Sequence, residues 1–147
     1  EHDYRMKYQL NHALDAAAEG ARVVGSDAER ARIVVAPSRE DLDLSIVKGQ
    51  REPRYEGWQL LSESDAREAP ALIYTWREQA PSGLETVIWP VPPGEEADLA
   101  VSREVDGGMV TLTVTRGDLR DVIDIGADDT LKLRRYQGAE LVTDVEQ

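Results

Sequence analysis

The chain has 147 residues, and its 29 acidic and 17 basic side chains give a formal net charge of -12 at pH 7. This charge opposes binding to nucleic acids, which requires clustered Lys and Arg side chains, and a hydrophobic content of 41% excludes wholesale disorder. The absence of Cys excludes disulfides and thiolate-bound zinc, and the longest apolar run is too short to cross a bilayer.

Strand patterns dominate the chain. Residues 4–10 and 42–46 alternate between apolar and polar side chains, which predicts half-buried strands. Denser apolar runs predict strands that are buried on both faces, at 33–36, 71–76, 86–91 and 122–125. Within these runs we expect Tyr74, Trp76 and Trp89 to be core residues.

Helical patterns are few. The Ala-rich segment 13–19, which Gly20 follows, predicts two helical turns. Segment 64–69, which ends before Pro70, predicts one more turn.

Short strands separated by turn residues fill the end of the chain. They predict a meander with strands at 97–105, 109–115, 119–125, 131–136 and 139–145. The sequence shows no alternation of strands and helices of the kind that would predict a parallel sheet. The sequence therefore predicts an all-β fold, an antiparallel β-sandwich of about ten strands with at most one or two short helices.

We expect one domain over residues 1–147. Because it opens in the middle of a strand pattern, we expect it to be a segment of a longer protein.

The longest stretch without a strand pattern, 48–70, combines aromatic, Gly and Pro residues. It predicts a loop that is held in place by its aromatic side chains. For Tyr55 and Trp58, an exposed position is as consistent with the sequence as a buried one. Tyr and Trp on a β surface can stack on sugar rings, and they can equally build a core with a polar tip. Lys48, Arg51 and Arg54 flank the two rings.

The other polar patterns have structural explanations. His2 and His12 lie too far from other histidines for a typical zinc site. The acidic groups Glu40/Asp41/Asp43, Asp121/Asp124 and Asp128/Asp129 fit solvated strand faces and turns better than a glycosidase carboxylate pair. Arg116-Gly117-Asp118 spells an adhesion tripeptide, but its place between two strands predicts a tight turn.

Several motifs together resemble the C-terminal sandwich of heparinase II/III-like polysaccharide lyases. They are an apolar strand ending in Ala36-Pro37, a loop through Gly49 to Gly57-Trp58, a Pro70-Ala71 strand and the strand Thr86-Val87-Ile88-Trp89-Pro90. The opening strand to Leu10 resembles a family strand that ends in aromatic-His-Leu. The resemblance covers residues 1 to 92.

The resemblance implies that the parent enzyme cleaves uronate-containing polysaccharides by β-elimination. The catalytic residues would lie in an N-terminal helical domain of the same chain, so none is expected here, and this chain alone is expected to be inactive. The family often holds a structural metal in this sandwich. Here Gln9 stands where the family has His, so we expect no metal and no cofactor, with His12 as a weak candidate ligand.

The loop with Arg51, Arg54, Tyr55 and Trp58 is the surface expected to bind the polysaccharide or to face the helical domain. A periplasmic or secreted location follows from the same resemblance. The main alternative is an autonomous carbohydrate-binding or adhesion module, and a third is a stand-alone glycosidase or other hydrolase. Neither nucleic acid nor a membrane is an expected partner.

Overall fold

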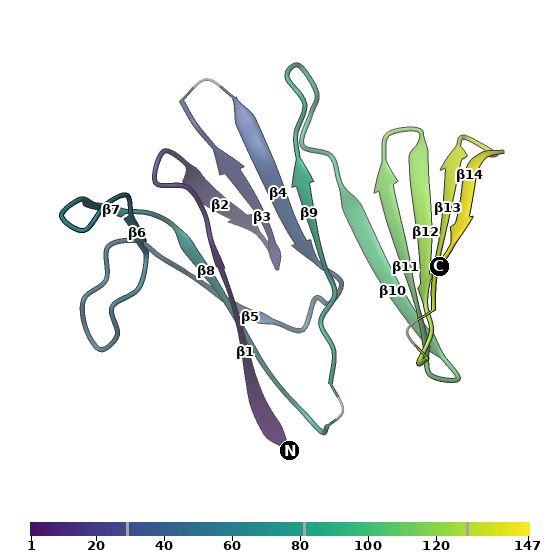
Figure 1. The fold of residues 1–147 in the computed structure, drawn as a ribbon, viewed down its shortest axis with the longest axis horizontal. Coiled ribbons are helices and arrows are strands. Elements are labelled where there is room, and N and C mark those ends of the chain that lie inside the picture. Colours follow the sequence, from purple (N-terminus) through teal and green to yellow (C-terminus); the bar gives the residue numbers. More distant parts are fainter. Residues whose placement is uncertain (29, 81, 129) are drawn as a thin grey trace.

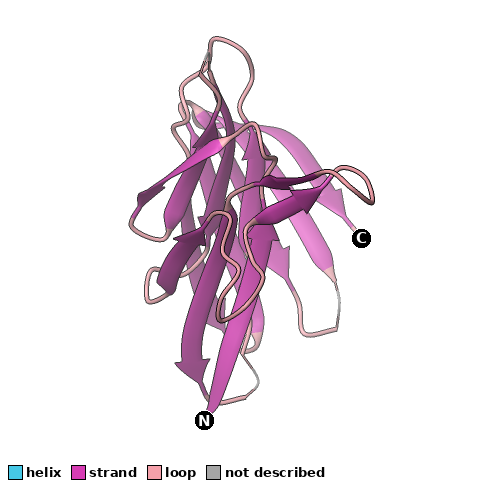
Figure 2. Ribbon diagram, turned by 90° about the vertical axis from the view of Figure 1, so that its left-hand side faces the viewer, coloured by secondary structure: helices cyan, strands magenta, loops and turns pink. Residues whose placement is uncertain are grey.

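The computed structural model describes residues 1–28, 30–80, 82–128 and 130–147. These residues contain strands and loops and no helix (Figure 2). The predicted all-β, antiparallel, sandwich-like class is confirmed. No described part of the chain forms a helix long and apolar enough to cross a membrane.

In the described ranges the strands form three larger sheets and one small hairpin, all antiparallel. The outer sheet has the order β1-β8-β5, with β1 at His2–Gln9, β8 at Ala71–Glu78 and β5 at Asp43–Val47. The central sheet has the order β2-β3-β4-β9, with strands Asp15–Glu19, Arg22–Ser26, Ala31–Pro37 and Thr86–Pro90.

The C-terminal sheet is a five-stranded meander in sequence order, β10 to β14. Its strands are Ala100–Asp106, Met109–Arg116, Leu119–Ile125, Leu131–Gln137 and Glu140–Glu146, which confirms the predicted meander. The hairpin pairs β6 (Trp58–Leu60) with β7 (Ala66–Glu68). Figure 1 shows the central sheet between the outer sheet and the C-terminal sheet.

The core is divided between the two faces of the central sheet. Val35 of β4 packs on one face with Leu72 and Tyr74 of β8. Val34, one residue earlier, packs on the opposite face with Val114 of β11. Side chains alternate across a strand, so the predicted burial of 33–36 on both faces follows from its place in the middle layer.

The two predicted helical segments are strands instead. Residues Asp15–Glu19 form β2, and their ladder to β3 joins Ala17 to Val24 and Ala18 to Val23. Five residues are too few to offset helix nucleation, so the ladder overrides the helix propensity of alanine. Residues Ala66–Glu68 form β7, which pairs with Trp58–Leu60.

The prediction from the sequence that certain strands are buried on both faces overestimates the burial of some of their residues. Tyr74 is fully buried, and its hydroxyl donates to the Ala21 carbonyl at 2.9 Å. Trp76 and Trp89 are only half-buried, as are all residues of 122–125. Trp89 lies on β9, an edge strand of the central sheet. Trp76 lies near the end of β8, and residues 122–125 belong to β12; both of these are inner strands of their sheets.

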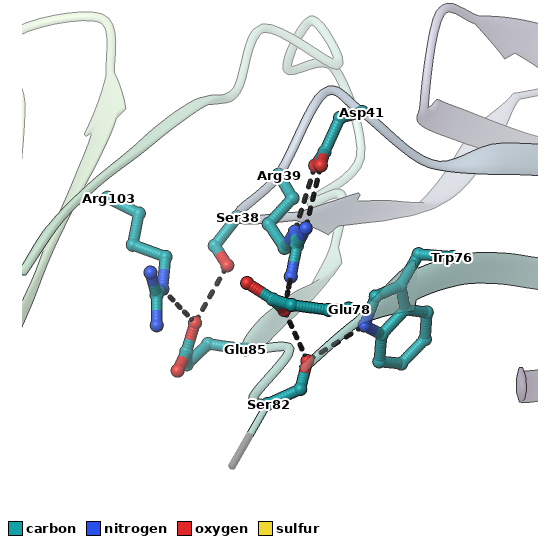
Figure 3. A network of polar contacts seen from close by, with 8 residues as sticks. All are labelled: Ser38, Arg39, Asp41, Trp76, Glu78, Ser82, Glu85 and Arg103. Atoms are coloured by element: carbon teal, nitrogen blue, oxygen red, sulfur yellow. Dashed lines mark hydrogen bonds and ion pairs between the residues drawn. The ribbon is translucent and has the colours of Figure 1, made fainter. Parts of the chain in front are cut away.

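Polar side chains tie the three larger sheets together at one end (Figure 3). The network contains Ser38, Arg39, Asp41, Trp76, Glu78, Ser82, Glu85 and Arg103. Glu85, just before β9, accepts hydrogen bonds from Ser38 and from Arg103 of β10, each at 2.8 Å. Arg39, just after β4, donates to Asp41 and to Glu78 of β8. The network thus links the central sheet to both of its neighbours.

Shortening a buried valine side chain on either face of β4 should destabilise the fold to a similar degree. We expect Val34→Ala and Val35→Ala each to lower the free energy of unfolding by about 2 kcal/mol, since each removes two buried methyl groups. Urea denaturation measures both, with Val122→Ala, at a half-buried position, as the milder control. A loss confined to one of the two valines would contradict the two-sided core.

Acid should weaken the network of Figure 3. Partial burial favours a higher pKa for the Glu85 carboxyl, but the bonds from Arg103 and Ser38 outweigh it and hold the pKa below the ordinary 4.5. A lowered carboxyl pKa stabilises the fold above the unfolded-state pKa, and this stability is lost as the pH falls through the folded-state pKa. We expect the unfolding free energy to fall below about pH 4.5, and to fall less in Glu85→Gln. Urea denaturation at several pH values measures this. An equal dependence of the unfolding free energy on pH in both proteins would refute the prediction.

Candidate functional site

The best candidate site is built on the aromatic loop, which we define as residues 49–58. Its two ends pair as a short ladder, in which Gln50 and Glu56 exchange backbone hydrogen bonds of 2.9 and 3.0 Å. The Gly49 amide donates to the Gly57 carbonyl at 2.9 Å. The predicted loop is therefore closed at its base by backbone bonds.

Gly57 is required at this base. Its φ is 73°, a left-handed conformation that side chains rarely adopt. A Cβ atom there would lie 2.5 Å from the backbone oxygen of Val47. The base of the loop thus packs directly on the end of β5.

The aromatic side chains form a stack. The rings of Tyr55 and Trp58 lie 5.3 Å apart with an interplanar angle of 15°. The Arg51 guanidinium lies 5.4 Å from the centroid of the Trp58 ring, and the indole nitrogen donates to the Gln50 carbonyl at 3.0 Å. Tyr55 remains 61% exposed. The loop therefore presents a tyrosine ring on a support that is already ordered.

Glu56 attaches the loop to the outer sheet. Its side chain is nearly buried and forms an ion pair with Arg5 of β1. Arg5 lies on the face of the outer sheet that points away from the central sheet, because Tyr8, at an even position, packs in the core. The aromatic loop therefore lies against the outward face of the outer sheet.

This outward face carries a group of cations, which we name the basic face: Arg5, Lys7, Arg51, Arg54 and Arg77. All five residues are exposed. Arg77 binds Asp3 at 2.7 Å and lowers the pKa of that carboxyl through a hydrogen bond and charge attraction. Lys7, Arg51 and Arg54 have no carboxylate partner within the described ranges. Three cations of the basic face therefore lack an ion pair in the described part of the chain, while the exposed Glu52 lies on the same loop.

A hollow of about 400 Å³ lies on the same face, where β1 and β8 run side by side. Its lining includes Arg5 and Arg77 as well as Asp3 and Asp43. Arg5 also binds the aromatic loop, so the hollow and the loop are neighbours.

The structure brings together most of the predicted site residues. Arg51, Tyr55 and Trp58 form one stack, and Arg54 is exposed on the same loop. Lys48 does not join them, since its ammonium binds Asp15 of β2 at 3.0 Å. Val47 and Lys48 alternate across the end of β5, which turns Lys48 toward the central sheet.

Sequence reasoning missed the contribution of the outer sheet. Arg5, Lys7 and Arg77 are far from the loop in sequence. The signal for two of them was present, because Arg5 and Lys7 occupy the polar positions of an alternating strand. Only the ion pair between Arg5 and Glu56 shows which surface that polar side joins.

The surroundings of His12 do not suit a cation. Its Nδ1 lies 2.9 Å from the Gln59 Oε1, and its Nε2 lies 3.2 Å from an Arg67 nitrogen. The Gln9 amide donates to the carbonyls of Ala69 and Pro70. Among the described residues, no three His, Asp or Glu side chains converge in a way that could hold a metal.

The acidic groups mostly form ion pairs and turns. Asp121 binds Arg135 through two bonds of 2.7 and 2.8 Å, which lower its carboxyl pKa. Asp124 binds Thr111 and Arg134. Arg39 engages Asp41 in the same way. Asp129 lies outside the described residues.

The tripeptide 116–118 follows the predicted turn geometry. Arg116 ends β11, and Gly117 turns the chain with a φ of 52°. The Arg116 guanidinium lies over the Trp89 ring, 5.3 Å from its centroid. Packing of Arg116 on Trp89 supports a structural role for this side chain.

The base of the aromatic loop provides a stability test. We expect Gly57→Ala to destabilise the protein by at least about 1 kcal/mol more than Gly138→Ala, because both change a left-handed glycine but only Gly57 faces a backbone atom. Urea denaturation gives the difference, and near-ultraviolet circular dichroism reports the aromatic stack. Equal losses for the two variants would mean that the loop base is not tightly packed.

Comparisons with known protein families, with curated proteins and with solved structures find no match to this chain.

Proposed function

We propose that this chain binds acidic polysaccharide through the basic face and the aromatic loop, as the non-catalytic sandwich domain of a polysaccharide lyase of the heparinase II/III-like kind. One observation carries the proposal: an exposed tyrosine, held on a closed loop, stands among unpaired cations in a protein of net charge -12.

The chemistry of the face suits a uronate-containing chain. A sugar ring can stack on the free side of Tyr55, while a guanidinium can bind a carboxylate with two parallel hydrogen bonds. Arg51 and Arg54 lie on the loop itself, and Lys7 lies on the adjoining strand. Because these cations are exposed, their attraction for the glycan should weaken as salt is added.

Cleavage belongs to another part of the proposed enzyme. β-Elimination requires a base, a group that stabilises the enolate and an acid for the leaving oxygen. The carboxylates Asp41, Asp121 and Asp124 are held in ion pairs or hydrogen bonds rather than presented as such a set. We therefore assign catalysis to an N-terminal helical domain and binding to this chain, in a periplasmic or secreted protein.

The second candidate is an autonomous carbohydrate-binding module. The projecting position of Tyr55 favours it, because a single exposed ring on a loop can bind a glycan without a facing domain. The intact mass of the native gene product separates the two. A much larger protein that releases unsaturated uronate supports the lyase, and a product near 16.3 kDa supports the module.

Substitutions at the aromatic loop should weaken glycan binding. We expect Tyr55→Ala and Arg51→Ala each to reduce the affinity of the chain for uronate-containing polysaccharides by about tenfold. This corresponds to the loss of about 1.4 kcal/mol of binding free energy from stacking and charge attraction. Isothermal titration calorimetry with several acidic polysaccharides and a neutral glucan measures this.

A matched control lies on the opposite side of the protein. Tyr136 of β13 also packs with an arginine, since the Arg120 guanidinium lies 4.5 Å from its ring centroid. Tyr136→Ala should leave the affinity unchanged. No binding of acidic glycans by the folded chain, or an equal loss in Tyr136→Ala, would refute the proposed site.

A further inference from the structure

One long edge of the central sheet is open. β9 is the last strand of that sheet, and on its other side no described strand pairs with it. The Glu85 carbonyl and the Val91 amide bond toward β4. Backbone groups alternate in direction along an antiparallel strand, so the groups of Thr86 and Ile88 point to the open side. This edge offers unpaired donors and acceptors beside Ile88, which is 50% exposed.

The C-terminal sheet extends past this edge. Trp89 of β9 packs on Arg116 at the end of β11. A groove of about 210 Å³ runs between β9 and β12, and its lining combines apolar residues such as Ile88 and Ile123 with the charged Arg116 and Asp121. β13 and β14 lie beyond β12 in the sheet order. The central sheet therefore covers only the near part of the C-terminal sheet.

The inward face of the uncovered part of the C-terminal sheet carries an apolar row beside the ion pair of Asp121 with Arg135. Val114 lies on that face, and the register places Ile123, Leu133 and Val145 on it too, because paired residues of neighbouring strands share a face. Ile123 and Leu133 are half-buried, and Val145 is 44% exposed. Such a face normally packs against another layer.

We propose that an extended segment of another polypeptide adds to β9 as a fifth strand of the central sheet. Its backbone would pair with Thr86 and Ile88, and alternate apolar side chains would cover Ile123 and Leu133. This is strand addition to a sheet edge, in which backbone bonds give affinity and pockets select side chains. A strand satisfies both the open edge and the apolar floor, which a helix or a small molecule would not.

Charge defines one end of the incoming strand. Near the Pro90 end of β9, a second groove is lined by Glu95, Glu96 and Asp98, with the cation Arg116 also in its lining. All three acidic residues are exposed, and none forms an ion pair within the described ranges. A Lys or Arg at the end of the segment that passes this groove would be attracted to them. The partner is therefore apolar at alternate positions and basic at one end.

A second copy of this chain does not fit the edge. Two β9 strands paired antiparallel would be related by a twofold axis perpendicular to the central sheet. Both C-terminal sheets would then lie on the same side, and each extends beyond its own β9. They would occupy the same space, which favours a different polypeptide.

A synthetic peptide tests the proposal. Its sequence, Lys-Lys-Thr-Val-Thr-Val-Thr, places the basic end beside Pro90 when it pairs antiparallel with β9. We expect about 1 mM peptide to slow amide hydrogen exchange at Thr86 and Ile88, measured by NMR, and a peptide with Glu in place of Lys to bind about tenfold more weakly.

Two variants locate the binding. Ile88→Pro removes a donor on the open side while leaving the bonds to β4, and Ile123→Ser makes the floor polar. Each variant should weaken peptide binding by about tenfold, which corresponds to a loss of about 1.4 kcal/mol of binding free energy. Ile46→Ser, at a similarly half-exposed isoleucine of the outer sheet, should not.

If Ile88→Pro fails to fold, Ile123→Ser still decides the outcome. Unchanged exchange at Thr86 and Ile88 with about 1 mM peptide, or binding that both variants leave intact, would overturn the proposal.

Discussion

Burial of the central sheet on both faces is the constraint on which the rest of this structure depends. β4 supplies Val35 to one core and Val34 to the other, and both are almost completely buried. A strand in the middle layer must be apolar where both of its faces are covered, as β4 is at 33–36, whereas a strand in an outer layer alternates. The outer sheet and the C-terminal sheet can therefore each expose one polar face, and the candidate functional surfaces lie on those outer layers and at their edges.

Charge is distributed unevenly over this frame. Most acidic side chains are solvated or paired with arginines on strand faces, as Asp121 is with Arg135. The basic face instead leaves Lys7, Arg51 and Arg54 without carboxylate partners in the described part of the chain. The ion pair between Arg5 and Glu56 fixes the aromatic loop beside these cations. A rigid loop loses little conformational entropy when it binds, which helps a single exposed ring to contribute to affinity.

The two proposed surfaces differ in the chemistry that would recognise them. The aromatic loop offers a ring and cations, which suit an acidic sugar chain. The open side of β9 offers backbone groups above an apolar floor, which suit a protein strand. They lie on different layers, since the loop contacts the outer sheet and the groove faces the C-terminal sheet. Occupation of one surface therefore leaves the other accessible.

The sequence by itself determined the all-β class, the C-terminal meander and the turn at 116–118, because alternation and turn residues act over short distances. It also placed Tyr55 and Trp58 in one loop. It missed β2 and β3, where an Ala-rich run and a short Val pair have no period long enough to recognise. The layer order, the covering of β4 on both sides and the exposure of β9 and β12 were decided only by tertiary structure. The meeting of Arg5 with Glu56, fifty-one positions away, was decided there too. Local patterns tell which positions a strand buries, but only packing tells which surface covers them and where that cover ends.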